Sequence, residues 1–191
     1  MIAVRMAWRW MFAWAIGTTA LALMVVAGAA NGAEEPVPPS TVASVDLTHY
    51  AGKWYEIARI PNRFQKDCVG NVMATYRIRE DGRLDVLNEC EQKGGTIKKA
   101  EGIAKIVDPS TNAKLKVSFV SFFGYRPFWG DYWILGLGPD YEYAVVGSPD
   151  REYGWILARD PHPDPRIVEE ARMVLREQGF DPDLFEQSRQ D

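Results

Sequence analysis

Cysteine and histidine are residue types often used in catalysis and metal binding, and this 191-residue chain contains only two of each. Two histidines cannot build a three-histidine metal site, and neither lies at the spacing of a zinc motif such as HExxH. The chain also lacks a GxSxG turn, a glycine-rich phosphate loop ending in GK[ST] and a CxxC pair. The sequence therefore predicts no metal, no cofactor and no catalytic residue.

Acidic and basic side chains nearly balance, at 26 against 22, which gives a formal net charge of −4. Such a chain offers no basic surface for nucleic acid, whose binding depends on neutralising phosphates. Hydrophobic residues make up 47% of the sequence and aromatic residues 12%. The composition thus argues against a nucleic-acid partner and favours a small, aromatic-rich binding domain.

Glu56 is the acidic residue with the clearest potential for chemistry, because it follows Trp54 by two residues and would share its face of a strand. A buried carboxylate must be paired, hydrogen-bonded or protonated. No second carboxylate lies at a spacing that would fix it opposite Glu56 as a catalytic partner. We expect Glu56 to orient a water or the head group of a ligand.

Residues 1–33 are typical of a secretory signal peptide. They contain Arg5 and Arg9, carry no charge from residue 10 to residue 33 and include a small-residue stretch at 27–30. The uncharged run is also long enough to cross a bilayer, so an uncleaved anchor is the alternative. Residues 34–45, with prolines at 36, 38 and 39, are expected to form a flexible lead-in. We predict that the protein is exported. Direct lipidation is not expected, because the first cysteine is Cys68.

Cys68 and Cys90 are expected to form a disulfide, since the thiols of an exported protein meet an oxidising compartment. Two alternatives stay open. Both thiols could be buried and free, as in a cytosolic protein. One could instead act as a nucleophile, although no basic partner for it is apparent.

From Gly52 onward, short segments of alternating apolar and polar residues are separated by turn residues, the pattern of an all-β domain. Strands are predicted at residues 53–60, 69–79, 84–91, 96–107, 113–120, 131–137, 142–148 and 153–160. Eight strands with short connections favour an antiparallel up-and-down calyx barrel, because closure removes the edges of the sheet. A two-sheet sandwich is the alternative.

One helix is predicted after the strands, with Asp164 as N-cap, Pro165 at its first position and Gly179 at its C-terminal end. Its apolar residues form one stripe: Ile167, Val168, Ala171, Val174 and Leu175. Such a stripe predicts a structural brace that packs against the outside of the barrel. Residues 46–186 are thus predicted to form one barrel domain, and residues 187–191 a frayed tail.

Three segments, taken together, resemble the motifs of the lipocalin family. Gly52-Lys53-Trp54 resembles the Gly-x-Trp motif that enters the first strand. Gly138-Pro139-Asp140-Tyr141 resembles the Thr-Asp-Tyr turn, with Pro139 in place of threonine, and residues 155–159 resemble the third motif, which ends in Arg159. The run 46–186 is similar to the bacterial, apolipoprotein-D-like branch of that family, the outer-membrane lipoprotein type.

Strand parity gives an independent check on this resemblance. Neighbouring antiparallel strands alternate in direction, so the start of the first strand, the turn before the seventh and the end of the eighth meet at one end. Those places hold the structural motif residues Gly52, Trp54, Asp140, Tyr141 and Arg159. A guanidinium stacks favourably on an indole, so Trp54 and Arg159 are expected to close that end. Both cysteines fall at the opposite end, where a disulfide would hold residues 61–67 against the rim.

That opposite end is predicted to be the entrance for a ligand. Its loop 121–130 carries five aromatic residues, which would form an apolar rim unless they pack among themselves. An eight-stranded barrel can hold one small ligand that is reached from such a rim.

Parity with Trp54 and Arg159 identifies residues that should face the interior. It places Glu56 and Ala58 of the first strand, and Trp155 and Leu157 of the last, inside the barrel. Further ligand-binding candidates, whose face a β-bulge would reverse, are Tyr76, Asn88, Phe119 and Tyr132. The family resemblance adds Trp129 and Trp155 as positions that contact ligand, and it implies a fatty acid or a lysophospholipid as the ligand.

The chain is therefore predicted to be a non-enzymatic lipid carrier that maintains or repairs the cell envelope. Small residues at Ala58 and Ala104 favour a cavity over a filled interior. One alternative is an interaction module whose aromatic loop contacts a protein partner or the membrane surface. Another is an enzyme that uses Cys90 or Glu56, and a disulfide would remove its thiol version. The resemblance implies a periplasmic location, with an association with the outer membrane left open. A peripheral contact with the membrane and a homodimer are also left open.

Overall fold

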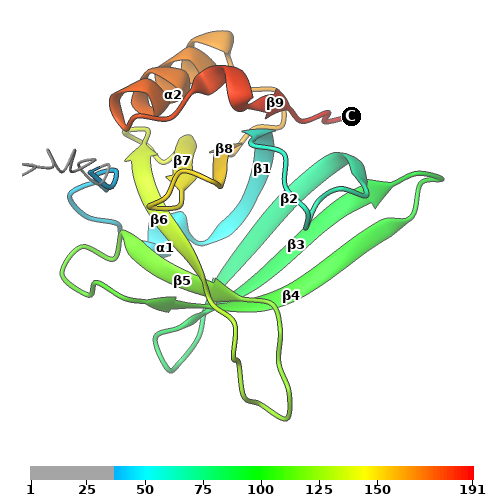
Figure 1. Cartoon of the computed structure of the whole chain (residues 1–191), viewed down its shortest axis with the longest axis vertical. Coiled ribbons are helices and arrows are strands. Elements are labelled where there is room, and N and C mark those ends of the chain that lie inside the picture. Colours follow the sequence, from blue (N-terminus) through cyan, green and yellow to red (C-terminus); the bar gives the residue numbers. More distant parts are fainter. Residues whose placement is uncertain (1–36) are drawn as a thin grey trace, which may run out of the picture. The chain divides into compact units, whose positions relative to one another are not determined.

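The computed structural model describes residues 37–191, and the predicted signal segment 1–33 lies outside the described residues. The strands are β1 (Gly52–Arg59), β2 (Cys68–Ile78), β3 (Leu84–Gln92), β4 (Ile97–Ile106), β5 (Lys114–Ser118), β6 (Gly130–Leu137), β7 (Tyr143–Gly147), β8 (Gly154–Ala158) and β9 (Glu186–Gln187). The α-helices are α1 (Leu47–Tyr50) and α2 (Pro165–Glu177), and a 3₁₀ helix spans Pro182–Leu184. Figure 1 shows this order from the blue to the red end of the chain.

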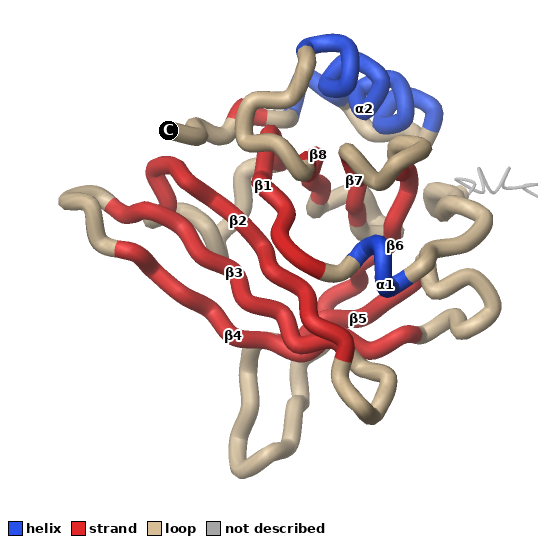
Figure 2. Tube along the Cα trace, turned by 180° about the vertical axis from the view of Figure 1, so that it is seen from behind, coloured by secondary structure: helices blue, strands red, loops and turns tan. Residues whose placement is uncertain are grey.

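Strands β1 to β8 form one closed antiparallel sheet, because each pairs with the next and β1 pairs with both β2 and β8. The short strand β9 joins the side of β1 (Figure 2). This arrangement confirms the predicted up-and-down barrel and rules out the two-sheet sandwich. Each strand predicted from the alternation of residues is present, with limits that differ by two residues or fewer.

The barrel has two different ends. We call the end that carries α1 and the turns 79–83, 107–113 and 138–142 the closed end. We call the end that carries the loops 60–67, 93–96, 119–129 and 148–153 the mouth. Every predicted motif segment falls at the end that strand parity assigned to it, because all the pairings are antiparallel.

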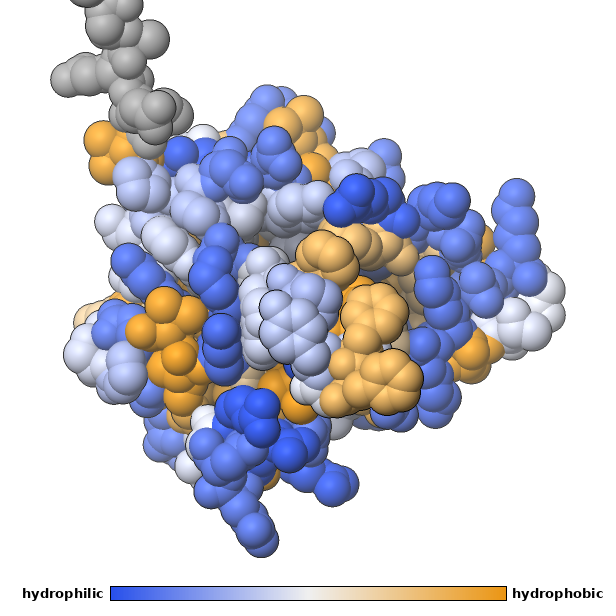
Figure 3. Space-filling model, turned by 60° about the horizontal axis from the view of Figure 1, so that its bottom comes forward, coloured by the Kyte–Doolittle hydropathy of each residue, from blue (hydrophilic) through white to orange (hydrophobic). Residues whose placement is uncertain are grey.

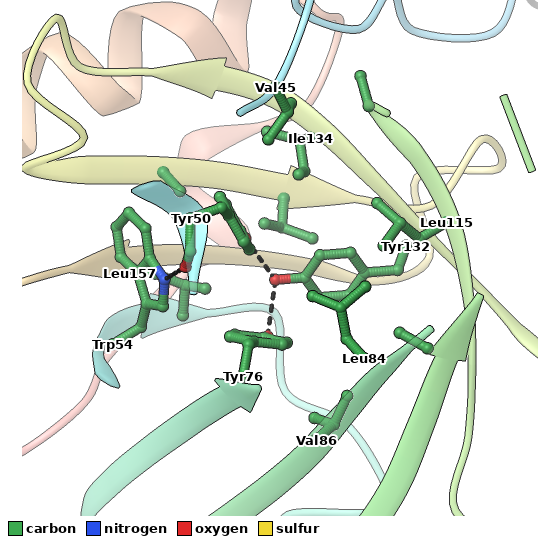
Figure 4. Close-up of a cluster of buried hydrophobic side chains, with 14 residues drawn as sticks. Val45, Tyr50, Trp54, Tyr76, Leu84, Val86, Leu115, Tyr132, Ile134 and Leu157 are labelled. Carbon is green, nitrogen blue, oxygen red and sulfur yellow. Dashed lines mark hydrogen bonds between the residues drawn. The ribbon is translucent and has the colours of Figure 1, made fainter. Parts of the chain in front are cut away.

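The closed-end half of the barrel interior is filled by a cluster of buried side chains (Figure 4). Its largest members are Tyr50, Trp54, Tyr76 and Tyr132, and leucines, valines and alanines from all the surrounding strands complete it. Burial of this apolar area at roughly 25 cal/mol per Å² is the main force that holds the sheet closed. The ligand space predicted by the sequence is thus limited to the mouth half.

A second cluster of buried side chains lies outside the barrel, between α2 and strands β6 to β8. The helix contributes Ala171 and Leu175, which the predicted apolar stripe contained. It also approaches β6 closely, since a Cβ added at Gly136 would lie 2.8 Å from a methyl carbon of Val174. The prediction of a helix outside the barrel is confirmed, and glycine at position 136 allows the contact.

Strand β1 changes partner halfway along its length. On one edge, residues 52–55 pair with β2, and Ala58 and Arg59 pair with β9. The other edge pairs with β8 from Tyr55 to Arg59. Towards the mouth, β1 no longer pairs with β2, and the C-terminal residues lie between the two strands. Asn71 of β2 donates its N–H to the carbonyl of Arg189, and Ser188 donates its N–H to the carbonyl of Ile57 in β1. Residues 187–191 were predicted to be frayed, but hydrogen bonds to two strands hold them in place.

The segment before the barrel also differs from the expectation of a flexible lead-in over 34–45. In its described part, Val45 is only 3% exposed and belongs to the interior cluster. The Val42 N–H donates to the carbonyl of Ile134 at 3.0 Å, and the Ser40 N–H donates to the side chain of Gln178 at 2.7 Å. The two valines bury apolar surface against the barrel, and this outweighs the disordering tendency of the prolines.

Helix α1 was not predicted, because four residues are too few to show a helical period. Its start has a recognisable cap, since Oδ1 of Asp46 accepts the N–H of Thr48 at 2.7 Å. The helix matters for the interior because it ends at Tyr50, whose side chain is buried among the tyrosines of the barrel.

Candidate ligand-binding site

Trp54 and Arg159 close one end of the barrel together. The Cζ atom of Arg159 lies 3.8 Å from the centre of the Trp54 ring, at cation–π distance. The same guanidinium donates hydrogen bonds to the carbonyls of four residues around α1: His49, Tyr50, Ala51 and Lys53. Partial burial lowers the pKa of Arg159, while these acceptors satisfy its N–H groups.

The other motif residues lie at the same closed end. Gly52 has a φ of +93°, a conformation that suits glycine, and Arg159 packs 3.5 Å from where its Cβ would be. The hydroxyl of Tyr141 accepts the N–H of Asp46 at 2.9 Å, and Asp140 lies in the adjacent β6–β7 turn. The structure thus places these residues in structural contacts, as the sequence analysis expects.

Three tyrosine hydroxyls form a chain of hydrogen bonds where the packed core ends on its mouth side (Figure 4). The oxygen of Tyr132 lies 2.7 Å from the oxygen of Tyr50 and 2.7 Å from that of Tyr76. Burial raises the pKa of Tyr76 to about 12 and raises the pKa of both Tyr50 and Tyr132 well above 10. All three hydroxyls therefore stay neutral and protonated at physiological pH.

On the mouth side of the tyrosines, the wall made by β2, β3 and β4 carries small side chains. The register pairs Asn88 with both Ala74 and Ala100, and it pairs Val86 with Gly102. Ala74 packs against the interior cluster and Ala104 belongs to it, so these alternate residues all face inward. Ala74, Asn88 and Ala100 are only half-buried, which shows that this part of the inner wall keeps accessible surface.

Asn88 is the polar residue of this small-residue wall. Its Oδ1 atom is buried and has no hydrogen-bond partner in the described residues. A buried carbonyl oxygen without a partner is costly, so it is available to a hydrogen-bond donor such as water or a ligand. The structure thus places Asn88 on the inner wall, and its contact with a ligand stays a prediction.

Trp155 and Phe119 lie on the inner surface nearer the mouth. Trp155 is half-buried beside the interior cluster, and its Nε1 donates to the side chain of Gln65 at 3.1 Å. Phe119 is 40% exposed, and its ring lies against the inward Gly102. Both side chains keep aromatic surface on the inner wall, as predicted, where an acyl chain could contact them.

Glu56 is buried at 3% exposure and is fully paired. Its carboxylate accepts hydrogen bonds from Nη1 of Arg59 at 2.7 Å, from Nε2 of Gln65 at 2.6 Å and from the hydroxyl of Ser188 at 2.5 Å. These contacts satisfy the buried carboxylate. Its free acceptor capacity for a ligand head group is accordingly small.

Ala58, which was predicted to face the interior, and Trp129, which the resemblance gave as a ligand contact, both face outward. A β-bulge between Glu56 and Ala58 shifts the register with β8, so Ala58 joins the outer cluster under α2. The prediction that Ala58 faces the cavity is therefore wrong, because the extra residue of the bulge reverses its face. The ammonium nitrogen of Lys105 lies 4.2 Å from the centre of the Trp129 ring. Lys105 follows the inward Ala104 in β4, so the side chain of Lys105 is on the outer face. The structure thus brings Trp129 to the outer face of β4, away from the other candidates.

The mouth carries the disulfide and most of the exposed aromatic residues. Cys68 and Cys90 are joined, with their Cα atoms 5.6 Å apart, which confirms the predicted pair. In the β5–β6 loop, at the bottom of Figure 1, the exposed aromatic residues are Phe119, Phe122, Phe123, Tyr125 and Phe128. Figure 3 brings this face forward and shows tan and orange side chains grouped among blue, hydrophilic ones.

A groove of about 760 Å³ lies outside the barrel, between β1, the start of α2 and the C-terminal residues. Ala58, Val168 and Arg172 are among the residues that line it. Ser188 lines it as well. The hydroxyl of Ser188 points the other way, towards the barrel interior, where it donates to Glu56. The sequence analysis did not identify this groove, because it forms between elements far apart in the chain.

The described residues contain no group of three His, Cys, Asp or Glu side chains that could hold a metal ion. Within residues 37–191, no helix is long and apolar enough to cross a membrane.

Tyr50, Arg59 and Ser188 were missed as members of the interior. Tyr50 enters from the unpredicted helix α1, and Ser188 comes from the segment that was expected to fray. Arg59 faces inward because the β-bulge that turns Ala58 outward shifts the next residue as well. The sequence analysis considered a bulge only for candidates in other strands, and no residue in the sequence fixes the position of the bulge in β1.

A closed eight-stranded barrel with one sealed end and an accessible inner wall defines a binding protein for small hydrophobic molecules. A family model described as a lipocalin-like domain matches residues 45–190. The chain belongs to the lipocalin family, whose members are binding and transport proteins for small hydrophobic ligands.

The chain is similar to relatives from bacteria and animals. It is 39% identical over 154 residues to the outer membrane lipoprotein Blc of Escherichia coli (strain K12), covering 78% of this chain and 84% of the relative. It is 37% identical over 155 residues to apolipoprotein D of Rattus norvegicus, covering 76% and 77%. Among solved structures, insecticyanin of the tobacco hornworm Manduca sexta matches with a TM-score of 0.64 at 23% identity, covering 82% of this chain and 86% of that one.

Proposed function

We propose that this protein is an exported lipid carrier that holds a fatty acid or a lysophospholipid in the mouth half of its barrel. The observation that carries this proposal is the inner wall beyond the tyrosines, where Ala74, Asn88, Ala100 and Trp155 keep accessible surface. An acyl chain placed there gains about 0.8 kcal/mol for each buried CH₂ group. The wall has few polar groups, so contact area would supply affinity and the head group would remain near the mouth.

Maintenance of the cell envelope is the role that we propose for this carrier. The support is its similarity to a relative named as an outer membrane lipoprotein. The disulfide agrees with an oxidising compartment such as the periplasm. Both cysteines of the chain are used in that bond, so neither offers a thiol for lipid attachment. We therefore propose a periplasmic carrier that is not itself lipidated.

Displacement of a fluorescent fatty acid by unlabelled lipids tests the ligand class, and two neighbouring substitutions make the test specific. Ala100 faces inward and is half-buried, whereas Glu101 is exposed on the outer face. Ala100→Trp should weaken acyl-chain binding by more than tenfold because the indole occupies the ligand space, and Glu101→Trp should leave binding unchanged. Equal affinity in both variants and the wild type would argue against binding inside the barrel.

Native mass spectrometry of the protein purified from the host periplasm provides a test without substitutions. We expect a copurified lipid mass that is lost on delipidation, together with a polypeptide mass that lacks residues 1–33. An empty protein that also takes up no added fatty acid or lysophospholipid would refute the proposal.

A second candidate function is contact with a membrane surface through the β5–β6 loop. Phe123 is fully exposed at the tip of this loop with a φ of +49°, and Gly124 follows with a φ of +85°. A non-glycine residue rarely adopts this left-handed conformation, and an exposed phenylalanine there stabilises no core. Cosedimentation with anionic phospholipid vesicles should fall in a Phe122→Ser/Phe123→Ser variant. Unchanged cosedimentation in this variant would assign the loop to another role, such as contact with a protein partner.

A further inference from the structure

The chain of tyrosine hydroxyls has one hydrogen more than it can use. Tyr50, Tyr132 and Tyr76 carry three O–H groups, but only two hydrogen bonds join them. The described residues provide no other hydrogen-bond partner for these oxygens. Whichever way the bonds run, one O–H lacks an acceptor among the described residues. It is that of Tyr50 or Tyr76 when the bonds run head to tail, and that of Tyr132 when both ends donate to it.

The position of Arg159 favours one direction for this chain of bonds. Its guanidinium donates to the backbone carbonyl of Tyr50 at 3.2 Å, so the positive charge lies on the Tyr50 side. A nearby positive charge attracts the lone pairs of a hydroxyl oxygen and repels its hydrogen. The hydrogen of Tyr50 thus points towards Tyr132. A head-to-tail run is stronger than two donors that meet at one oxygen, because a hydroxyl that accepts a hydrogen bond becomes a better donor. The hydrogen of Tyr132 then points towards Tyr76, and the free hydrogen belongs to Tyr76.

Tyr76 is the hydroxyl-bearing residue next to the accessible wall. In β2, the next inward position towards the mouth is Ala74, which is half-buried. Tyr76 keeps 5% of its surface exposed and Tyr132 keeps 9%, whereas Tyr50 keeps 1%. A donor at the inner limit of an apolar site needs an acceptor there, because leaving a buried donor unpaired is costly.

We propose that Tyr76 donates a hydrogen bond to an acceptor oxygen at the inner end of the bound ligand. The ligand class is an acyl chain that carries a carbonyl or hydroxyl oxygen near the end that enters first. This inference rests on the proposed lipid carrier and narrows its ligands, because a plain hydrocarbon end would leave the Tyr76 hydroxyl unpaired. Selectivity for an oxygenated chain end then comes from one hydroxyl, while the rest of the chain is held by apolar contact.

The geometry of β5 sets the length of such a chain. Phe119, on the inner surface near the mouth, follows Leu115 by four residues, and Leu115 pairs with Tyr132. Four residues of a strand span about 14 Å, which an extended chain of roughly eleven carbons would match. A twelve-carbon acid whose carboxylate stays at the mouth would place its last carbons at the tyrosines.

Two isomeric keto acids test this proposal on the wild-type protein. Dodecanoic acid, 11-oxododecanoic acid and 6-oxododecanoic acid are compared by displacement of a fluorescent fatty acid. The two keto acids differ only in the position of the oxygen, so their general hydrophobicity is matched. We expect the 11-oxo acid to bind about five- to tenfold more tightly than the 6-oxo acid, as one neutral hydrogen bond allows.

A pair of variants from the same hydroxyl chain identifies the donor. Tyr76→Phe should reduce the preference for the 11-oxo isomer to less than twofold, because it removes the terminal donor. Tyr50→Phe should keep the preference, because Tyr132 can still donate to Tyr76 and leave its hydrogen free. Equal affinities of the isomers for the wild type, or equal preferences in both variants, would overturn the inference. Failure of all three acids to bind would instead refute the lipid carrier itself.

Discussion

The hydroxyl of Ser188, three residues before Asp191, lies 2.5 Å from Oε1 of Glu56 in the barrel wall. The same oxygen of Glu56 accepts Nη1 of Arg59, which also donates to the Ser188 hydroxyl at 3.2 Å. Serine, arginine and glutamate thus form one buried group at the seam between β1 and β2. The C-terminal residues are therefore part of the barrel wall.

Replacement of Ser188 by alanine should destabilise the protein without changing its fold. The variant removes a hydrogen bond to a buried carboxylate, and bonds to charged groups contribute about 2 kcal/mol. We expect a loss of this size in the free energy of unfolding, measured with urea. Glu186→Ala, in the same segment but exposed, serves as the control and should have little effect. If Ser188→Ala also unfolds at the wild-type urea concentration, the seam is held by other contacts.

Arg159→Lys should lower the stability of the closed end even though it keeps the positive charge. A lysine cannot stack on the Trp54 ring and reach four backbone carbonyls at the same time. We expect a loss of roughly 2 to 3 kcal/mol, seen as a lower Tm. Arg166→Lys, at an exposed ion pair, is the matched control. A Tm equal to that of the wild type would show that charge alone closes this end.

Reduction of the disulfide should weaken the mouth. Cys68 and Cys90 are separated by 22 residues, and a closed loop of that size stabilises a protein by roughly 3 kcal/mol through the unfolded chain. The Cys68→Ser/Cys90→Ser variant is expected to show this loss in urea unfolding, and a reducing agent should then have no further effect on it. A variant as stable as the oxidised wild type would contradict the prediction.

The barrel was predictable from the sequence because its strands alternate cleanly, and the alternation fixes a face for each residue. Leu115, Val117 and Phe119 illustrate this, since one face of a strand is apolar and the other wet. The ends of the barrel followed from strand direction, which placed Trp54 and Arg159 together and both cysteines at the mouth.

The misplaced residues share a physical cause: their positions depend on backbone irregularity or on contacts between distant segments. One bulge in β1 turned Ala58 outward and Arg59 inward. Trp129 lies at the end of a loop, outside the predicted strands, so strand parity was not used to assign its face. The resemblance gave Trp129 a ligand contact, which its position against Lys105 on the outer face does not support. Val45 and Ser188 lie in segments without a period, where burial depends on the surface of the finished barrel.

The cap of α2 should remain charged in strong acid. The side chain of Arg166 and its backbone N–H lower the pKa of Asp164 to about 2. A depressed carboxyl pKa contributes stability that is present above the usual value near 3.8 and lost as the pH falls through about 2. An NMR titration of the Asp164 carboxyl should show this pKa in the wild type and a higher one in Arg166→Ala. An unchanged pKa in the variant would leave the backbone N–H as the cause.

The tyrosine chain predicts a loss of stability in base. Burial raises the pKa of Tyr76 to about 12 from an ordinary value of 10.0, so the folded protein keeps this proton when the unfolded chain has lost it. Stability is then complete below about pH 10 and falls as the pH rises towards 12, because only the unfolded state ionises freely. Tyr76→Phe should remove part of this dependence, so the difference in stability from the wild type should shift in favour of the variant between these pH values. Urea unfolding at neutral and alkaline pH measures that shift, with Tyr125→Phe on the exposed loop as the control. A difference that stays constant with pH would show that Tyr76 ionises equally well in the folded barrel, and it would contradict a hydroxyl held in an apolar, water-poor interior.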